Sequence, residues 1–304
     1  MAKKTKSLSV EKLWSIAWPP KLWKRILNII IALVLAWTGF AYGVAEWYLH
    51  HHDGEPLVLG TTFVPDYATS YGLDPMQTLQ AILEPASQGG LGMKQVRLVS
   101  YWSDIEGTQG TYDFSQLDQE FALADKYGAQ VALSIGLRQP RWPECHPPDW
   151  VANEPTSVWQ PQLNAFMKAV IQRYRNNPAL SDYELENEFF MKVFGTCTNF
   201  DRSRLVSEYT MVKQLDPNHP VIVSRSDNWV GIPLGQPRPD ISAISVYKRV
   251  WDATFTHRYF EYPLPPWFYS ALAGFEEIST GRNTIIHELQ AEPWAPNGLD
   301  VTQL

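Results

Sequence analysis

The chain has 304 residues, of which 45% are hydrophobic and 19% are charged, so its composition suits one large core and excludes a disordered chain. Seven basic and two acidic residues precede Asp53 and give this arm a charge of +5; because the whole chain carries −7, the remainder carries −12. An acidic domain repels phosphate backbones and anionic lipid headgroups, which argues against nucleic acid as a partner and favours a neutral substrate.

Residues 26–49 form a mostly apolar run, and ~20 such residues are enough to cross a hydrocarbon core as a helix. A buried core helix and a cleavable signal peptide are the alternatives, but the length of the run and the lack of a clear small-residue cleavage site favour a signal anchor. Lys and Arg concentrate before the run, while Trp47 and Tyr48 close it, so the N-terminus is expected to stay in the cytoplasm.

The predicted organisation is therefore a cytoplasmic basic arm at 1–25, a transmembrane signal anchor at 26–49, a linker at 50–56 and an extracytoplasmic catalytic domain at 57–304. Three consecutive histidines, His50 to His52, point in divergent directions, which favours a solvated linker over a metal site. Cys145 and Cys197 both lie in the exported part, where oxidation permits a disulfide, although two free thiols are the alternative.

From Leu57 onward, short β-rich runs alternate with helical patterns, which is typical of a parallel sheet built from βα units. Asp74 and Asp201 are placed to cap two of the helices. Seven strands are predicted, at 57–65, 95–102, 129–137, 180–188, 220–227, 241–248 and 283–289, and helices at 75–87, 115–127, 158–175 and 202–215. Proline-rich stretches at 140–148, 233–239 and 263–266 are interpreted as rigid loops.

This alternation predicts a TIM (β/α)₈ barrel that lacks its eighth strand in this chain. Such a barrel takes ~250 residues, and 57–304 spans about that length, but only fifteen residues follow the seventh predicted strand. A fragment of a longer protein and an open seven-stranded variant are the two explanations. An exposed barrel edge is costly, which favours the fragment.

Catalytic groups of a (β/α)₈ barrel lie where its strands end, at the C-terminal face. The fourth predicted strand ends at Asn187-Glu188, and period two predicts that Glu184, Glu186 and Glu188 share one face. Glu288 follows the apolar segment of the seventh strand. Two facing carboxylates about 5 to 5.5 Å apart can hydrolyse an acetal with retention, although an isolated Asn-Glu pair is by itself an ordinary strand end.

Through these motifs the exported part resembles the clan of retaining (β/α)₈ glycosidases that includes cellulase-like and β-galactosidase-like families. The resemblance implies that Glu188 is the acid/base, that Glu288 is the nucleophile and that Asn187 holds the sugar 2-hydroxyl. It further implies an Arg on strand two, matched by Arg97, and an aromatic hydroxyl on strand six, matched by Tyr247. The alternatives are that Arg97 neutralises a buried acid and that Tyr247 is a core residue.

A cation or phenol beside Glu288 would keep that carboxylate ionised. Surroundings with fewer such groups would raise the pKa of Glu188, so that it can donate a proton. Trp142, after the third strand, and Trp229, after the fifth, are candidate sugar platforms, although tryptophan also packs interiors. Glu144 and His146 are weaker candidates in the same loop as Trp142. The clan often carries a functional Trp on strand eight, which this chain does not reach.

The sequence thus predicts a retaining glycoside hydrolase that cleaves a β-linked oligo- or polysaccharide by a two-carboxylate double displacement. A transglycosylase and a non-catalytic carbohydrate-binding barrel remain open, because the fold alone does not decide activity. A metal-dependent hydrolase is disfavoured, since His146 and His287 alone do not make a ligand set. No metal or organic cofactor is implied, and the expected partners are a carbohydrate and a membrane; the sugar, linkage and oligomeric state are left undecided.

Overall fold

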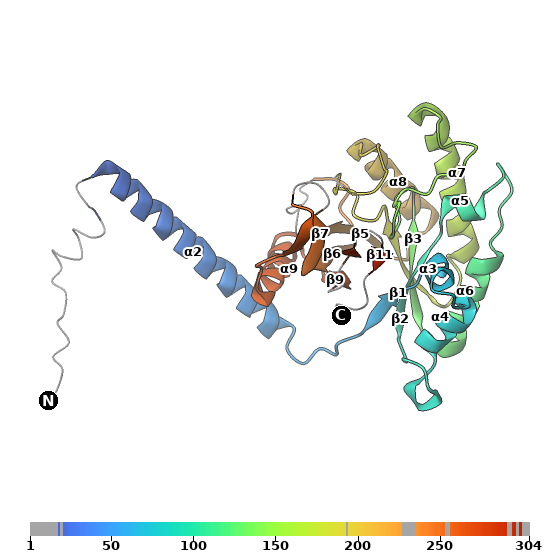
Figure 1. The fold of residues 1–304 in the computed structure, drawn as a ribbon, viewed down its shortest axis with the longest axis horizontal. Coiled ribbons are helices and arrows are strands. Elements are labelled where there is room, and N and C mark those ends of the chain that lie inside the picture. Colours follow the sequence, from blue (N-terminus) through green and yellow to red (C-terminus); the bar gives the residue numbers. More distant parts are fainter. Residues whose placement is uncertain are drawn as a thin grey trace. The chain divides into compact units, whose positions relative to one another are not determined.

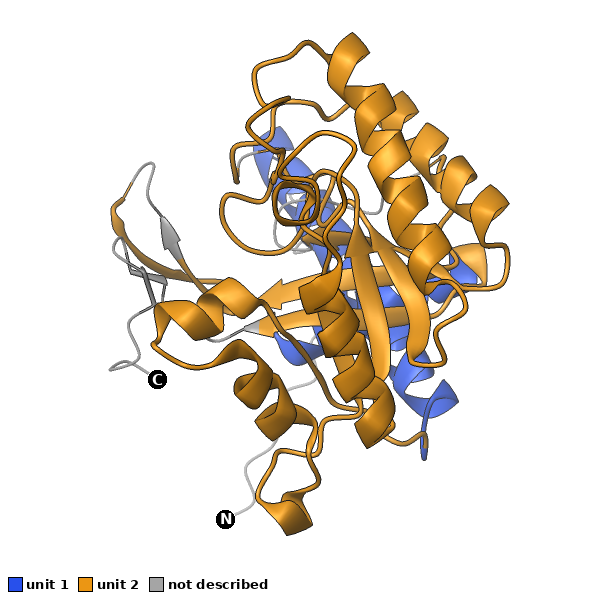
Figure 2. Ribbon diagram, turned by 90° about the vertical axis from the view of Figure 1, so that its right-hand side faces the viewer, with its two compact units in different colours: residues 1–54, 264–279 blue, residues 55–263, 280–304 orange. Residues whose placement is uncertain are grey.

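The computed structural model describes residues 18, 21–192, 194–226, 235–252, 256–290, 294–295 and 298–299. The chain forms two compact units, one of residues 1–54 with 264–279 and one of residues 55–263 with 280–304 (Figure 2). The larger unit holds every predicted catalytic residue that the structure describes.

A seven-stranded parallel sheet forms the centre of the larger unit, and its strand order follows the chain. The neighbouring strands all pair in parallel, as in a (β/α)₈ barrel, and β1 and β9 stand at the two ends of the order. The strands are β1 (Gly60–Thr62), β2 (Gln95–Val99), β3 (Gln130–Ile135), β4 (Leu180–Leu185), β5 (Val221–Ser226), β6 (Ile241–Tyr247) and β9 (Thr284–Gln290). All seven predicted strands are confirmed, with shorter ends at most of them.

The four predicted helices are also confirmed, as α4 (Pro75–Leu83), α6 (Ser115–Tyr127), α7 (Thr156–Tyr174) and α8 (Arg202–Leu215). Within this unit, α4, α6 and α7 lie along one side of β2 and β3 (Figure 1). Asp74 caps α4 by accepting the backbone N–H of Gln77 at 2.8 Å, and Asp201 caps α8 by accepting that of Ser203 at 2.8 Å. Both predicted caps are therefore present.

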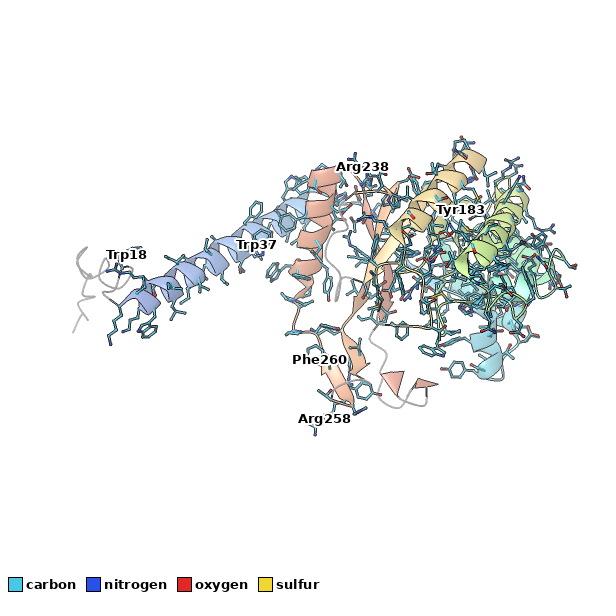
Figure 3. All side chains as sticks on the ribbon, turned by 90° about the horizontal axis from the view of Figure 1, so that it is seen from above. Trp18, Trp37, Tyr183, Arg238, Arg258 and Phe260 are labelled. Carbon is cyan, nitrogen blue, oxygen red and sulfur yellow. A yellow bond between two sulfur atoms is a disulfide. The ribbon has the colours of Figure 1, made fainter. Side chains whose placement is uncertain are left out.

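Several short elements and one long helix were not predicted. The long helix α9 begins at Pro266, although the prolines at 263–266 indicated a loop. Proline is compatible with the first helical turn, because a backbone N–H at that position has no partner within the helix. Arg258 and Phe260 lie on a strand of an antiparallel hairpin (Figure 3). The additional elements are α3 (Pro65–Ser70), η1 (Ala86–Gln88), α5 (Trp102–Ile105), β7 (Arg249–Asp252), β8 (Arg258–Glu261), α9 (Pro266–Thr280), β10 (Trp294–Ala295) and β11 (Gly298–Leu299).

The core of the larger unit lies between the sheet and these helices. Apolar strand residues such as Leu98 and Leu133 are fully buried, together with Phe121 of α6 and Phe166 of α7. The buried Tyr183 of β4, labelled in Figure 3, donates its hydroxyl to Asp216 at 3.0 Å. The strands are thus held firmly enough to place side chains at their ends.

The smaller unit pairs the N-terminal helix α2 (Leu22–His51) with α9. Trp37 projects from α2 and stacks on Phe275 with ring centroids 5.9 Å apart (Figure 3). A Cβ on Gly274 would lie 2.8 Å from a methyl of Val44, so glycine is what permits this close approach. His52 Nε2 lies 2.8 Å from a carboxylate oxygen of Glu277. Helix α2 extends through His51, so the first two residues of the predicted linker at 50–56 are helical.

By length and composition, α2 is long and apolar enough to cross a membrane, and it is the one such helix in the part of the chain that the structure describes. Large apolar side chains along it, including Leu33, Leu35 and Ile30, are exposed. A soluble helix with this surface would leave a broad apolar area in contact with water.

Candidate active site

The end of β4 supplies the polar residues around which the site is built. The strand ends at Leu185, because Glu186 and Glu188 have φ values of 55° and 44° in the left-handed region. The prediction that Glu184, Glu186 and Glu188 share one strand face is therefore wrong. Alternation holds only while the backbone stays extended, and here it turns immediately after Leu185.

Glu184 is a fully buried carboxylate with four polar neighbours. Arg97 Nη1 donates to both of its oxygens at 3.2 Å, and the hydroxyls of Ser134 and Ser224 donate at 2.6 and 2.7 Å. His287 Nδ1 lies 3.3 Å from it. Burial alone would raise the pKa of Glu184, but the charge of Arg97, the nearby His287 and these hydrogen bonds lower it well below its usual range. The ionised Glu184 fixes the position of Arg97.

Glu288 of β9 is held by the same arginine. Arg97 Nη2 donates to one oxygen of Glu288, and the hydroxyl of Tyr247, at the end of β6, donates to the other. Burial raises the pKa of Glu288, but the charge and hydrogen bond of Arg97 and the hydrogen bond of Tyr247 outweigh it, so this pKa is lowered. Arg97 and Tyr247 thus both contact the predicted nucleophile. Arg97 also neutralises the buried Glu184, as its alternative role required, whereas Tyr247 is more than a core residue.

Glu188 has the opposite electrostatic setting. Its backbone N–H donates to Ser224 Oγ at 2.9 Å, while its Oε1 is buried without a hydrogen-bond partner. Burial, followed by the negative charge of Glu288, raises the pKa of Glu188 to about 7, against smaller opposing effects of Ser245 and Arg138. These two carboxylates, one just after β4 and one on β9, therefore differ in protonation near neutral pH, one ionised and the other able to carry a proton.

Asn187 is oriented by a third acid that the sequence marked only as a weak candidate. Its Nδ2 donates to Glu144 Oε2 at 3.0 Å, and Arg138 lies 3.4 Å from the same oxygen. Burial raises the pKa of Glu144 to about 8, although Arg138 opposes this shift. The sequence signal for Glu144 was its place in the loop after β3, the same loop as Trp142.

A disulfide joins Cys145 to Cys197, which decides between the two states that the sequence left open. It links the loop after β3 to the loop after β4, so it connects Glu144 to the segment that follows Glu188.

Trp142, a predicted sugar platform, contacts Phe194 edge to face, with ring centroids 5.9 Å apart. Their side chains are 59% and 41% exposed, respectively. These two aromatic side chains offer an open apolar surface on the linked loops. Trp229, the other predicted platform, lies outside the described residues.

His146 is a packing residue in this structure. Its ring stacks on Tyr101 with a centroid separation of 3.6 Å, and burial lowers its pKa to about 4. Over the residues that the structure describes, no three His, Cys, Asp or Glu side chains are grouped as a metal ion would require.

Known proteins that are similar to this chain in sequence include glycosidases. No protein-family model matches the chain. It is 27% identical over 185 residues to mannan endo-1,4-β-mannosidase F of Aspergillus fumigatus, covering 61% of this chain and 32% of that protein. It is 35% identical over 189 residues to a probable mannan endo-1,4-β-mannosidase F of Aspergillus oryzae, covering 62% of this chain and 31% of that protein. A β-galactosidase of Haloferax lucentense is 23% identical over 163 residues, covering 45% of this chain and 23% of that protein. The chain therefore spans about a third of the length of the mannosidases it matches.

Solved structures with a similar arrangement are also glycosidases. An exo-β-1,4-mannosidase from Opitutaceae bacterium strain TAV5 gives a TM-score of 0.49 at 16% identity, covering 64% of this chain and 38% of that one. A β-galactosidase from Halorubrum lacusprofundi gives a TM-score of 0.47 at 13% identity, covering 63% of this chain and 40% of that one. The strand order and the parallel pairing of this chain by themselves define its fold.

Proposed function

We propose that this chain is a retaining β-glycoside hydrolase with Glu288 as nucleophile and Glu188 as acid/base. The observation that carries the proposal is a pair of carboxylates, one just after β4 and one on β9, whose pKa values are shifted in opposite directions by identifiable neighbours. A double displacement needs one ionised and one protonated carboxyl group in the same site. The glycosidase names of the relatives agree with this chemistry.

In the first step, Glu288 attacks the anomeric carbon while Glu188 gives its proton to the glycosidic oxygen, so the leaving sugar departs as an alcohol. The negative charge of Glu288 disappears as the glycosyl ester forms. Because that charge is one of the causes that raise the pKa of Glu188, its loss lowers this pKa again. Glu188 is then suited to take a proton from water, whose oxygen attacks the anomeric carbon and releases Glu288.

The other polar residues have supporting roles in this proposal. Arg97 and Tyr247 keep Glu288 ionised and oriented before attack. Asn187 presents the second N–H of its amide to the sugar 2-hydroxyl, since the first is donated to Glu144. Trp142 and Phe194 supply an exposed apolar surface on which a sugar ring can stack.

The proposed substrate is a β-linked oligo- or polysaccharide of neutral hexoses, with β-mannosides as the first class to test. The net charge of −12 after residue 52 disfavours polyanionic chains, and the similar proteins include two named as mannan endo-1,4-β-mannosidases. Product analysis separates hydrolysis, which releases free sugar, from transglycosylation, in which a sugar hydroxyl intercepts the same glycosyl ester.

The decisive experiment is to incubate the protein with 2-deoxy-2-fluoro-β-mannosyl and β-galactosyl fluorides and to digest it for mass spectrometry. Fluorine slows breakdown of the intermediate, so we expect a covalent sugar on the peptide that contains Glu288, with Glu188 unlabelled. Folded protein that stays unlabelled by both compounds would contradict the proposed nucleophile and favour the non-catalytic carbohydrate-binding alternative.

We also propose that α2 anchors the protein in a membrane with the N-terminus in the cytoplasm. Support comes from its length, its exposed apolar side chains and the basic residues that precede it. The full chain is expected to stay in the membrane pellet after alkaline carbonate extraction and to be digested by protease added outside sealed cells. Release by carbonate, or protection from external protease, would contradict the anchor or its orientation.

A further inference from the structure

Glu186 lies two residues before Glu188, but its side chain contacts a different set of residues. It is fully buried, and its two oxygens accept parallel hydrogen bonds from Nη1 and Nη2 of Arg204, both at 2.9 Å. The same carboxylate accepts the backbone N–H of Leu137 at 2.5 Å and that of Arg138 at 3.3 Å. One carboxylate thus joins the end of β4 to the loop after β3 and to α8.

The loop after β3 is shaped to receive this carboxylate. Gly136 has a φ of 106°, and a Cβ added there would lie 2.4 Å from Glu186 Oε1. Only glycine leaves room for the carboxylate and adopts this backbone conformation without strain. The backbone N–H of Glu186 also donates to the carbonyl of Ile135 at 3.1 Å, so both main chain and side chain are fixed to the end of β3.

Arg204 is equally constrained on the opposite side. It is buried in the first turn of α8, donates to Glu208 at 2.7 Å, and lies over the ring of Phe189 at 5.2 Å. Burial, then the charge of Glu186, raises the pKa of Glu208 to about 8, against the opposing charge of Arg204. Arg204 therefore bridges two buried carboxylates, with two hydrogen bonds to Glu186 and one to Glu208.

These contacts enclose a backbone turn that residues with a Cβ rarely adopt. Glu186 and Glu188 both have left-handed φ values, and such conformations persist only where the surrounding structure holds them. Arg138 Nε donates to the carbonyl of Asn187 at 2.7 Å, and the N–H of Met191 donates to the carbonyl of Glu188 at 2.8 Å. The turn carries the Glu188 carboxyl group away from the direction that an extended strand would give it.

We propose that Glu186 and Arg204 are a positioning pair, which holds the Asn187-Glu188 turn so that the Glu188 carboxyl group is aimed at the glycosidic oxygen. This inference rests on the proposed function, because it assigns Glu188 the role of proton donor. Neither Glu186 nor Arg204 touches the substrate in this assignment. Their effect is confined to the steps in which Glu188 gives or takes a proton.

The test compares leaving groups in the variant Glu186→Gln of the full chain. Gln keeps the size of the side chain but loses the charge and one acceptor for Arg204. Misplacement of the acid is expected to lower kcat/KM by on the order of 100-fold for alkyl glycosides, whose leaving group needs a proton. The same variant should lose less than about threefold with 2,4-dinitrophenyl glycosides, whose leaving group needs none.

Arg204→Lys provides a second variant, because Lys keeps the charge but cannot donate two parallel hydrogen bonds. It should show the same leaving-group dependence with a smaller loss, and it carries the comparison alone if Glu186→Gln does not fold. Asp216→Asn is the matched control: it alters a buried carboxylate at the other end of α8, which binds Tyr183. A loss of stability there should lower activity on both substrates equally.

Equal losses for both leaving groups in Glu186→Gln and Arg204→Lys would overturn the positioning role. Labelling by the fluoro sugars separates this result from failure of the proposed function, because fluoride departs without an acid. Labelling of Glu288 in the wild type and in both variants, together with equal losses, rejects the positioning pair alone. A wild type that is not labelled rejects the proposed function itself.

Discussion

Glu288→Gln is expected to lower turnover of β-glycosides by on the order of 10⁴-fold or more, for all leaving groups alike. The amide has no negative charge with which to attack the anomeric carbon, so no glycosyl ester forms. Gln keeps the shape of the side chain and an oxygen that can accept from Arg97, whose bonds to Glu184 and Thr62 are unchanged. The measurement is kcat/KM on an activated and an unactivated glycoside, with thermal unfolding to confirm that the variant is folded.

Glu84→Gln is a suitable control for this substitution, because Glu84 follows α4 in the connection that leads into β2, away from the strand ends that carry the site. It should leave kcat/KM within about twofold of wild type, because Glu84 is only partly buried and none of the residues of the site is changed. Near-normal turnover in folded Glu288→Gln would remove Glu288 as the nucleophile. A loss limited to unactivated substrates would instead assign Glu288 the acid/base role.

Glu188→Ala is expected to act differently on different substrates. Loss of a general acid costs about 10²- to 10⁴-fold where the leaving oxygen must be protonated, and little in the first step where it need not be. With a 2,4-dinitrophenyl glycoside, the glycosyl enzyme should form and then hydrolyse slowly, since no base activates water. Added azide needs no base, so it should restore turnover and yield a β-glycosyl azide.

The pH profile provides an independent check of the same residue. Glu188 must carry a proton in the first step, and burial and the charge of Glu288 raise its pKa to about 7. Wild-type kcat/KM for an unactivated glycoside should therefore fall as pH rises through about 7. This alkaline limb should be absent in Glu188→Ala. If the limb persists there, another group is the acid, and Glu144, whose pKa burial raises to about 8, is the first to test.

The fall of activity on the acidic side has a different origin. Glu288 must be ionised to attack, and its pKa is lowered by Arg97 and Tyr247 against the opposing effect of burial. Activity should thus persist to pH values below the ordinary pKa of a glutamate before it declines. The active range is expected to lie between these two limits, with the glycosyl ester forming across it.

Hydrophobic patterning by itself determined most of the sheet. The seven predicted runs became seven parallel strands in chain order, because β-rich runs that alternate with helical patterns are typical of βα units. The two helix caps were also predictable from the sequence, since Asp74 and Asp201 bind backbone N–H groups only a few residues away. Strand ends also indicated where Glu188 and Glu288 would lie, because parallel strands end on the same face.

Tertiary structure decided the features that depend on residues distant in the chain. Arg97 and Glu288 are separated by 191 positions and Tyr247 and Glu288 by 41, so no spacing rule encodes the contacts that set the pKa of Glu288. Glu144 lies beside Asn187 only because the loop after β3 folds toward the end of β4, and the two residues are 43 positions apart in the sequence. The end of β4 at Leu185 was misread because alternation assumes an extended backbone, whereas side-chain bonds from Glu186 to Arg204 and to the loop after β3 hold that backbone in a turn.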